Sequence, residues 1–492
     1  MSSAILVVDV GTSSVRSSIV HEDGSVTNTV QVPVLPSSPA PGMVELNARA
    51  IGEAVLSTAQ AACAAFGSPV AAVGIANQRA SSIVWDAKTG ELLGPSIGWQ
   101  DLRTVIQCLI LQGEGLRLAP NVTATKHQAI LDEIDPDRSR SKAGTLRCGT
   151  VDAYVAWILS EGSVFVTDAT NAGVTGLVDG TISHYDDRTL EILKISLGTL
   201  PAIVDSSGIV GLATALPGSP PIAGIAGDQQ ASLVGQGCFQ RGDAKITFGT
   251  GAMLNLVTAS EAAPAPVRAE HGTFPIVAFQ LGGKKTWGLE AIALSAGTCI
   301  EWLRDDLGFF KHAADSDALA ASVPSSDGVL FVPAFVGLGT PVWDFGARGA
   351  LLGLTRGTGR AHITRAVLEG IAARGADLVE AAEADSQLSL GALKVDGGLS
   401  RNETFVTALA NATGRTIELS SEVEATTRGA GFLAGLAVGT WNSLEEAAST
   451  VSPRNVVVPT VTDAERQMAR ERWLDARSRA EATIPELSGV QF

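Results

Sequence analysis

The chain has 492 residues, enough for two or three domains that each bury a substantial core. Hydrophobic residues make up 45% and charged residues 17%, a balance that excludes a disordered or fibrous protein. The net charge of -16, with no cluster of Lys and Arg, argues against a nucleic-acid partner.

The five cysteines are far apart and form no C-x-x-C or Cys/His group, so the sequence indicates neither a zinc site nor a disulfide framework. No apolar run reaches the about 18 residues that a membrane span needs. The N-terminal segment runs into Asp9 without a basic stretch, unlike a signal peptide. We therefore expect a soluble, cytoplasmic protein with reduced thiols and no membrane partner.

Two short glycine-hydroxyl turns are the most informative feature of the chain. The first, Asp9-Val10-Gly11-Thr12-Ser13-Ser14, lies between the apolar segments 5–8 and 15–20. The second, Gly249-Thr250-Gly251, lies between the apolar segments 245–248 and 252–257. A strand, such a turn and a second strand present backbone N–H groups and small hydroxyls to a phosphate. Two of them at corresponding places in two half-chains predict a duplicated nucleotide clamp.

Short apolar segments alternate with alanine-rich segments of helical period along the chain, which predicts an α/β fold. Further expected strands are 71–76, 222–226 and 393–395. The expected helices are 49–65, 298–306, 362–382, 403–413 and 427–438. The Pro- and Ser-rich segments 33–41 and 217–221 predict loops. We place the domain junction near residues 237–242, which divides the chain into domains 1–242 and 243–492.

Two more strand ends carry residues that ligand sites use. Asp228 follows the strand 222–226 at the start of a predicted helix, where α/β proteins place ligands. Asp396-Gly397-Gly398 follows the strand 393–395, and a Gly-Gly step lets backbone approach a ligand closely. Each has a structural alternative, because Asp commonly caps helices and Gly-Gly commonly forms a tight turn. Since the chain contains no P-loop, no Rossmann fingerprint and no protein-kinase signature, any ATP must be held by the paired turns.

In this order, the segments strongly resemble the FGGY carbohydrate kinases, and the glycerol kinases among them in particular. The resemblance runs almost end to end through both turns and both strand ends. Further matched segments are Asn77-Gln78-Arg79, Trp99-Gln100-Asp101, Gly149-Thr150-Val151-Asp152, Thr167-Asp168-Ala169-Thr170-Asn171, Val332-Pro333-Ala334-Phe335, Ala347-Arg348-Gly349-Ala350 and residues 352–369.

The resemblance implies an α/β fold of two actin-like (ribonuclease H-like) domains, each a mixed β-sheet flanked by helices, with a catalytic cleft between them. It implies that ATP with Mg2+ phosphorylates a hydroxyl of a small polyol or sugar. A homodimer is an assembly common in the family, although no segment of this chain encodes one readably.

The resemblance also assigns roles to residues at matched positions. Asp228 corresponds to the catalytic base, and Asp9 to the residue that holds magnesium. The residues matching nucleotide contacts are Thr12, Ser13, Ser14, Arg16, Gly249, Thr250, Gly297, Glu301, Gly398 and Asn402. The positions matching substrate contacts are Arg79, Ala80, Trp99, Asn121, Asp228, Gln229 and Met253. Proton removal from the acceptor hydroxyl requires Asp228 to face the phosphate turns.

Three positions of the expected substrate pocket depart from the glycerol kinases. Ala80 replaces a Glu that grips the polyol together with Arg, Asn121 replaces a Tyr, and Met253 replaces an aromatic residue. A hydroxyl left without its carboxylate partner costs about 1–3 kcal/mol, and the smaller side chains enlarge the pocket. One hypothesis is therefore a polyol or sugar longer than glycerol, with Asn121 as a replacement hydrogen-bonding group. The other is a glycerol kinase whose pocket lining has changed without a change of substrate.

Other departures bear on the alternatives. Val10 replaces the Gln of typical glycerol kinases and is closer to xylulokinase-like members, so a pentulose kinase is an alternative. Residues 211–221 lack the Gly-Gly-Lys-Gly-Gly-Thr-Arg loop that binds fructose 1,6-bisphosphate in bacterial glycerol kinases, and we expect no inhibition by it. An actin-like ATPase with a partner-binding role is the alternative of another class. The presence of Asn77-Gln78-Arg79, and of Asp228 beside Gln229, favours the kinase.

Overall fold

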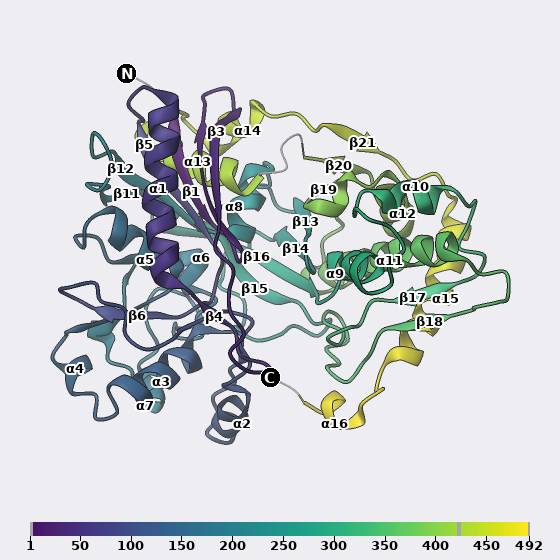
Figure 1. Ribbon diagram of the computed structural model, residues 1–492, viewed down its shortest axis with the longest axis horizontal. Coiled ribbons are helices and arrows are strands. Elements are labelled where there is room, and N and C mark those ends of the chain that lie inside the picture. The colour runs from purple at the N-terminus through teal and green to yellow at the C-terminus, as the bar shows by residue number, and fades with distance from the viewer. Residues whose placement is uncertain (1–2, 421–424, 491–492) are drawn as a thin grey trace.

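One mixed β-sheet of 13 strands runs through the computed structural model, which describes residues 3–420 and 425–490, and helices cover both of its faces (Figure 1). From edge to edge the strands lie in the order β21-β20-β19-β13-β14-β16-β15-β11-β12-β5-β1-β2-β3. Their bounds are β1 (Ile5–Val10), β2 (Ser14–Val20), β3 (Val26–Pro33), β5 (Ala72–Asn77), β11 (Ser207–Leu212), β12 (Pro221–Gly227), β13 (Ala244–Phe248), β14 (Ala252–Val257), β15 (Phe274–Leu281), β16 (Lys284–Ala293), β19 (Leu393–Asp396), β20 (Ile417–Leu419) and β21 (Asn455–Val457).

Smaller two-stranded ladders lie beside the main sheet. They pair β4 (Glu45–Leu46) with β7 (Ser96–Ile97), β6 (Ile83–Asp86) with β8 (Leu146–Gly149), β9 (Val166–Asp168) with β10 (Ala202–Val204), and β17 (Leu330–Val332) with β18 (Ala350–Leu352). Within the described residues, no helix combines the length and the apolar character needed to cross a bilayer.

The helices connect the strands and cover the sheet. They are α1 (Ala48–Phe66), α2 (Val105–Gly113), α3 (Thr123–Ile134), α4 (Ser139–Lys142), α5 (Val151–Leu159), α6 (Ala169–Ala172), α7 (Asp187–Leu193), α8 (Asp228–Gly235), α9 (Gly297–Glu301), α10 (Asp315–Ala321), α11 (Arg360–Ser386), α12 (Glu403–Thr413), α13 (Ala425–Val438), α14 (Leu444–Ser449), α15 (Asp463–Ala480) and α16 (Pro485–Ser488). Short 3-10 turns lie at Leu197–Thr199 and Gly398–Arg401, and a π turn at Trp302–Asp306.

The expected elements are present with small shifts at their ends. The expected helix 403–413 is α12, and the expected strand 252–257 is β14. The expected helix 298–306 is divided, because α9 ends at Glu301 and a π turn continues it. The predicted two-part α/β fold is confirmed, and the two expected sheets are joined edge to edge into one.

The first half of the sheet is apolar on both faces, as expected of strands that helices cover on each side. Along β1, Leu6 and Val8 pack into one buried cluster with α1 and α5, whereas Ile5 and Val7 pack into another with α13. Successive side chains of a strand point to opposite faces, so this near-continuous apolar run serves two cores at once.

The second half of the sheet is apolar on one face only. Ile246 and Leu254 point into a core with α11 and α12, whereas Lys245 and Asn255 point to the opposite face. That polar face is turned toward α8, which contacts β13, β14 and β15. The alternation thus places polar side chains of the second half against a helix of the first.

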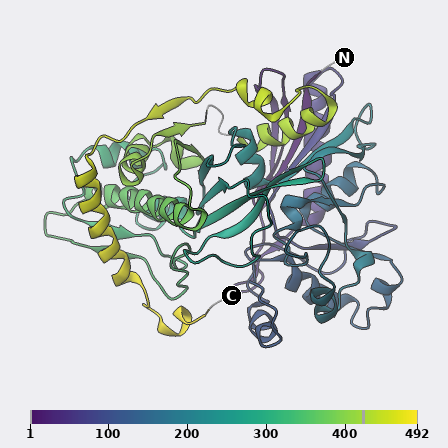
Figure 2. The same ribbon diagram turned by 180° about the vertical axis from the view of Figure 1, so that it is seen from behind.

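A single residue pair joins the two halves of the sheet. Ser207 of β11 pairs with Leu281 of β15, and no other register pair connects these strands in the described residues. The junction expected near residues 237–242 lies between α8 and β13. The division at 242/243 remains a prediction. The helix α13 follows this division in the chain but packs on β1, β5 and β12 of the first half (Figure 2).

Glycines allow α13 to approach α8 and the sheet closely. A Cβ at Gly429 of α13 would lie 1.8 Å from the carbonyl oxygen of Ala231 in α8. A Cβ at Gly235 of α8 would lie 1.9 Å from the carbonyl oxygen of Ala425. No side chain fits at these distances, so the crossing of the two helices depends on backbone-to-backbone contact.

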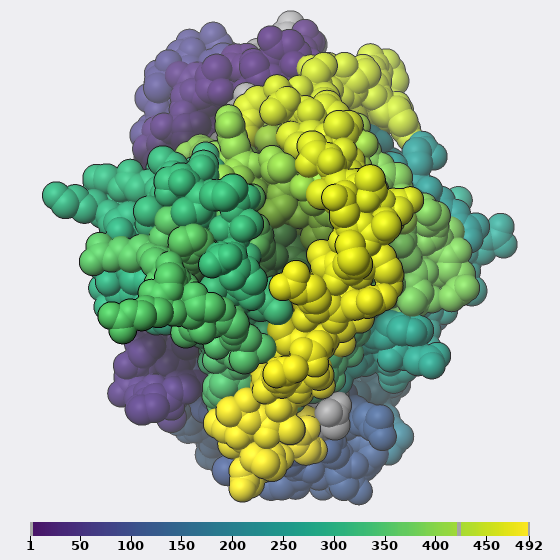
Figure 3. Space-filling model, turned by 90° about the vertical axis from the view of Figure 1, so that its right-hand side faces the viewer, coloured from purple at the N-terminus to yellow at the C-terminus, as the bar shows by residue number. Residues whose placement is uncertain are grey.

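The last long helix, α15, crosses the outer face of the second half, where Figure 3 shows the yellow C-terminal residues as a ridge. The buried carboxylate of Asp377 in α11 anchors it. Asp377 accepts hydrogen bonds from Arg470 Nη1 at 2.6 Å, Arg477 Nη1 at 3.1 Å and Trp473 Nε1 at 3.2 Å. The nearby arginines offset the burial of this carboxylate and keep its pKa below the ordinary value.

We predict that Gly429→Ala destabilises the protein by at least about 2 kcal/mol, because the new methyl group overlaps the backbone of α8. The matched control is Gly113→Ala at the end of α2, where nothing lies within 4 Å of the added Cβ. Its effect should stay within about 0.5 kcal/mol. Urea unfolding of both variants measures the difference, and equal stabilities would show that the close helix crossing is not constrained.

Candidate active site

The first glycine-hydroxyl turn joins β1 to β2 and is held from both sides. Gly11 N donates to Ser14 O at 3.0 Å, which closes the turn. The side chain of Gln78, after β5, donates to Gly11 O at 3.0 Å, and the indole of Trp99 donates to Thr12 Oγ1 at 3.3 Å. The predicted phosphate turn is therefore held by the side chains of Gln78 and of Trp99, and Trp99 is one of the predicted substrate residues.

Two carboxylates lie near each other at this end of the sheet. Asp9, at the end of β1, pairs in register with Arg16 of β2. Burial raises the pKa of Asp9 to about 6, which the positive charge of Arg16 opposes and the negative charge of Asp228 reinforces. The negative charges of Asp9 and Asp228 therefore repel each other.

Asp228 is the first residue of α8 and projects from the end of β12. Its Oδ1 lies 3.6 Å from Arg79 Nε and accepts a hydrogen bond from Gln229 N at 2.8 Å. Burial raises the pKa of this carboxyl, while Arg79, the Gln229 N–H and Lys245 lower it in part. A half-buried carboxylate with a raised pKa is suited to accept a proton.

A polar row crosses the second half of the sheet opposite these residues. Lys245 of β13 pairs in register with Asn255 of β14, which pairs with Glu290 of β16. Glu290 Oε1 accepts from Arg79 Nη2 at 2.7 Å and from Asn255 Nδ2 at 2.9 Å. Lys245 Nζ donates to Gln229 Oε1 at 2.6 Å. The two halves therefore meet through Arg79–Glu290 and Gln229–Lys245.

The second glycine-hydroxyl turn lies beside two other predicted nucleotide residues. Gly297 N donates to Gly249 O at 2.8 Å, and Ala296 N donates to Thr250 O at 2.9 Å. A Cβ at Gly397 would lie 2.3 Å from Phe248 O, and the φ of Gly397 is 88°. The turns after β13, β16 and β19 are thus in backbone contact, which only glycine permits at Gly397.

The remaining predicted nucleotide residues differ in their accessibility. Ser13, Glu301 and Gly398 are exposed, so each is accessible to a ligand. Asn402 is buried and caps α12, since its Oδ1 accepts from Phe405 N at 2.8 Å and its Nδ2 donates to Ser316 Oγ at 3.1 Å. Its predicted nucleotide contact remains a prediction, and its side chain already serves the helix cap.

The predicted substrate residues come from five separate segments of the chain, one of which is Asp228-Gln229. Ala80 is buried beside Arg79, Trp99 is half-buried after β7, and Asn121 is exposed just before α3. Met253 lies on the polar face of β14, two residues before Asn255. Trp99 reaches the first turn through Thr12, and Arg79 reaches Asp228, so these two are directly tied to the other predicted site residues.

Sequence reasoning missed Lys245, Asn255 and Glu290. Each lies inside a strand that is otherwise mostly apolar, and a charged or amide side chain in such a strand was the available signal. Lys245 and Asn255 are fully buried, and buried charged or polar groups need hydrogen-bond partners. The partners, Arg79 and Gln229, lie in the other half of the chain and could not be read from local pattern.

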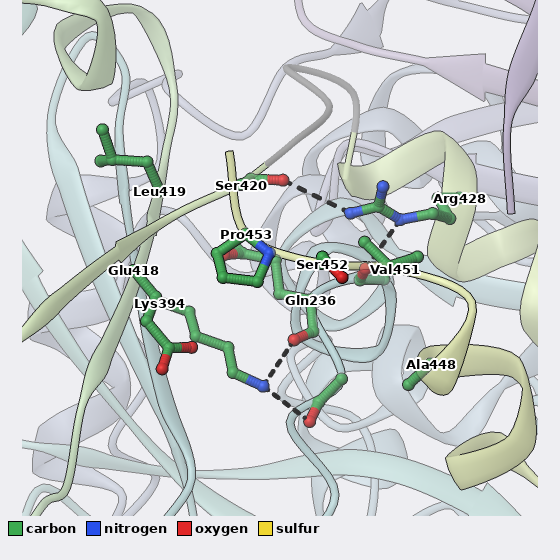
Figure 4. Close-up of a pocket in the computed structure, with 12 residues that line it drawn as sticks. Gln236, Lys394, Glu418, Leu419, Ser420, Arg428, Ala448, Val451, Ser452 and Pro453 are labelled. Carbon is green, nitrogen blue, oxygen red and sulfur yellow. Dashed lines mark hydrogen bonds between the residues drawn. The ribbon is translucent and has the colours of Figure 1, made fainter. Parts of the chain in front are cut away.

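A separate cavity of about 170 Å³ lies where α8 ends against β19, β20 and the segment after α14 (Figure 4). Lys394 Nζ donates to Gln236 O at 2.7 Å and to Gly237 O at 3.0 Å, and Arg428 Nε donates to Gly235 O at 2.9 Å. Cations on the carbonyls of a helix C-terminus stabilise that end. No predicted site residue lines this cavity.

The chain matches known proteins over its whole length. Residues 4–235 match the N-terminal domain, and residues 244–438 the C-terminal domain, of the FGGY family of carbohydrate kinases. A glycerol kinase of Aromatoleum aromaticum is 40% identical over 497 residues, covering 98% of this chain and 99% of the relative. The crystal structure of Plasmodium falciparum glycerol kinase with ADP is similar at a TM-score of 0.89 and 27% identity, covering 99% of both chains.

A ligand-bound xylulose kinase from Lactobacillus acidophilus is similar at a TM-score of 0.83 and 21% identity, covering 99% of both chains, which shows the shared fold alone. Both domain matches and the nearly full-length relative agree with the turns and strand ends described above. The chain therefore belongs to the FGGY family of carbohydrate kinases, phosphotransferases whose acceptor is an alcohol group.

Proposed function

We propose that this chain uses ATP to phosphorylate a hydroxyl of glycerol or a slightly longer polyol. The observation that carries the proposal is the setting of Asp228. Its carboxylate lies 3.6 Å from Arg79 Nε, at the start of α8 and opposite the polar row of the second half. The relatives named glycerol kinase at about 40% identity support the acceptor class.

In the proposed reaction, Asp228 accepts the proton of the acceptor hydroxyl as its oxygen attacks the terminal phosphate. The raised pKa of Asp228 makes it a better base than an exposed carboxylate, and Arg79 keeps it ionised. The two glycine-hydroxyl turns supply N–H groups to the spreading negative charge of the phosphates. Closure of the two halves would exclude water, which otherwise competes as the acceptor.

Two buried atoms support Arg79 as a substrate contact. Arg79 Nη1 and Asn255 Oδ1 have no hydrogen-bond partner among the described residues. A buried donor and a buried acceptor without partners are costly unless a ligand or water satisfies them. A hydroxyl can both donate and accept, so a polyol hydroxyl matches such a pair.

We propose Asp9 as the residue that holds Mg2+. The described residues contain no group of three or more His, Cys, Asp or Glu side chains that could hold a metal. Mg2+ bound with a nucleotide needs only one or two carboxylates, because phosphates and water complete its ligands. The mutual repulsion of Asp9 and Asp228 fits a site for a cation. When bound, the ion neutralises phosphate charge and helps to align the transfer.

The alternatives from the sequence differ in what supports them. Val10 favours a pentulose acceptor, and the likeness to a xylulose kinase adds only the fold. An actin-like ATPase driven by a partner protein is disfavoured, because the family membership shows a carbohydrate kinase. The acceptor panel described below distinguishes a polyol from a pentulose.

We expect Asp228→Asn to lower kcat by about 10²- to 10⁴-fold, because the amide cannot take the hydroxyl proton. The dissociation constant of ATP, measured by calorimetry, should be unchanged. Asp475→Asn, at an exposed position paired with Arg479, is the control and should keep full activity. Equal kcat values for Asp228→Asn and the wild type would remove Asp228 from the mechanism.

Glu290→Gln should raise the KM for the polyol about tenfold or more, since a charge-assisted bond that orients Arg79 becomes a neutral one. The KM for ATP should change little. The control is Glu383→Gln, which removes the charge from a more exposed pair with Arg415, 2.5 Å apart and outside the predicted site. Steady-state kinetics that show the same polyol KM in both variants would contradict the role assigned to the Arg79–Glu290 pair.

The enlarged-pocket hypothesis predicts that the double variant Ala80→Glu/Asn121→Tyr shifts preference toward glycerol. We expect the ratio of kcat/KM for glycerol to that for erythritol to rise about tenfold, because a hydroxyl partner is restored and space is removed. Glycerol, erythritol, threitol, xylitol and common pentuloses form the panel for the wild type. A wild type that already prefers glycerol by a wide margin, or an unchanged ratio in the variant, would exclude the enlarged pocket.

A further inference from the structure

The first turn of α3 carries a lysine that is completely buried. Lys126 has no exposed surface, and its Nζ donates to three backbone carbonyls. The acceptors are Ala80 O at 3.1 Å, Trp99 O at 3.4 Å and Asn121 O at 2.8 Å. All three acceptors belong to residues predicted from the sequence to contact the substrate, and they lie on three separate segments.

The number of acceptors matches the chemistry of the side chain. An ammonium group has three N–H donors and no acceptor, so three carbonyls satisfy it completely. A fully buried lysine is rare unless it is paired, and among the described residues Lys126 forms no ion pair. Lys126 therefore binds three backbone carbonyl groups and does not neutralise a carboxylate through an ion pair.

The charged groups around Lys126 are few. Burial lowers the pKa of Lys126 to about 7, and the negative charge of Asp101 raises it only in part. Asp101 is engaged by Arg103, whose Nη2 lies 2.8 Å from its Oδ2. His127, the next residue, stays neutral because burial lowers its pKa to about 3, and its Nδ1 lies 2.5 Å from Ser82 Oγ.

One of the three acceptors has an unusual backbone. Ala80 has a φ of 62°, a left-handed conformation that a residue with a Cβ adopts only when its surroundings hold it there. Ala80 directly follows Arg79, which contacts Asp228 and Glu290. The hydrogen bond from Lys126 to Ala80 O therefore fixes the backbone from which Arg79 projects.

We propose that Lys126 is a positioning residue for the acceptor pocket, which sets the relative placement of the segments that carry Arg79 and Ala80, Trp99, and Asn121. The inference rests on the proposed function. Lys126 lies behind the pocket wall and touches carbonyls rather than substrate, so it acts on acceptor binding and selectivity through its neighbours.

The test compares Lys126→Met with a control at Arg138, which lies just before α4. Arg138 is also a buried cation that donates to backbone carbonyls, those of Lys194 at 2.9 Å, Leu131 at 2.9 Å and Asp135 at 2.7 Å. None of these residues is predicted to contact substrate. Arg138→Met therefore removes a similar set of backbone hydrogen bonds, and an ion pair with Asp132 in addition, from residues outside the predicted pocket.

We expect Lys126→Met to lower kcat/KM for the polyol by about 10- to 100-fold, mainly through KM, and to change the glycerol-to-erythritol ratio. The dissociation constant of ATP should change much less than the polyol KM. Even if the Trp99–Thr12 bond weakens, the bonds from Gln78 to Gly11 O and from Gly11 N to Ser14 O still hold the first turn. Arg138→Met should lose thermal stability but keep the polyol KM. Lys126→Gln retains two N–H donors on a shorter chain, should show a smaller rise in KM, and decides the matter if Lys126→Met does not fold.

The outcomes separate this inference from the function on which it rests. If no polyol increases the rate of ATP turnover by the wild type, the proposed function is refuted. A wild type that phosphorylates polyols, with folded Lys126 variants that keep its polyol KM and selectivity, would overturn the positioning role alone. The same KM shift in Arg138→Met would also overturn it, since the effect would then follow from general destabilisation.

Discussion

The ion pair between Arg79 and Glu290 connects the two halves of the molecule at the point where the proposed chemistry takes place. Arg79 follows β5 in the first half, and Glu290 lies within β16 in the second. The Nε of the same guanidinium lies 3.6 Å from Asp228 Oδ1. One side chain therefore contacts both the proposed base and a residue of the opposite half. Burial strengthens these interactions, because little water competes for the charges.

The rest of the fold makes this contact possible. The alternation of side chains along β13, β14 and β16 turns Lys245, Asn255 and Glu290 toward α8, while their neighbours fill the core with α11. On the other side, the glycines of α8 and α13 hold α8 close to α13, which packs on the first half of the sheet. In the described residues a single register pair joins the two halves of the sheet, and the packing of α6 on β15 and of α8 on β13, β14 and β15 adds to their connection.

Much of this arrangement could be predicted from the sequence because its signals are local. The glycine and hydroxyl residues that follow apolar segments indicated the two turns predicted to bind phosphate. The residues around Asp228 and Gly397 resemble segments that follow strands in the FGGY family. The helix 403–413 and the strand 252–257 were readable from period and composition alone. A feature can be predicted from a sequence when a few neighbouring residues determine both its backbone conformation and its chemistry.

The parts that could not be predicted depend on contacts between residues far apart in the chain. Nothing near Glu290 in the sequence indicates that Arg79, 211 residues away, is its partner. Lys126 looks like an ordinary helical lysine until its three carbonyl partners are known. The continuous sheet and the packing of α13 on the first half were hidden for the same reason, since a local pattern does not specify which sheet a helix covers.

A crystal structure with a non-hydrolysable ATP analogue, Mg2+ and glycerol or erythritol would test the central claim most directly. The account predicts an acceptor hydroxyl within about 3 Å of the Asp228 carboxylate, in contact with Arg79, and pointed at the terminal phosphate. That phosphate should lie between the turn at Thr12 and Ser13 and the turn at Gly249 and Thr250. An acceptor bound away from Asp228, or a nucleotide bound outside the two turns, would contradict it.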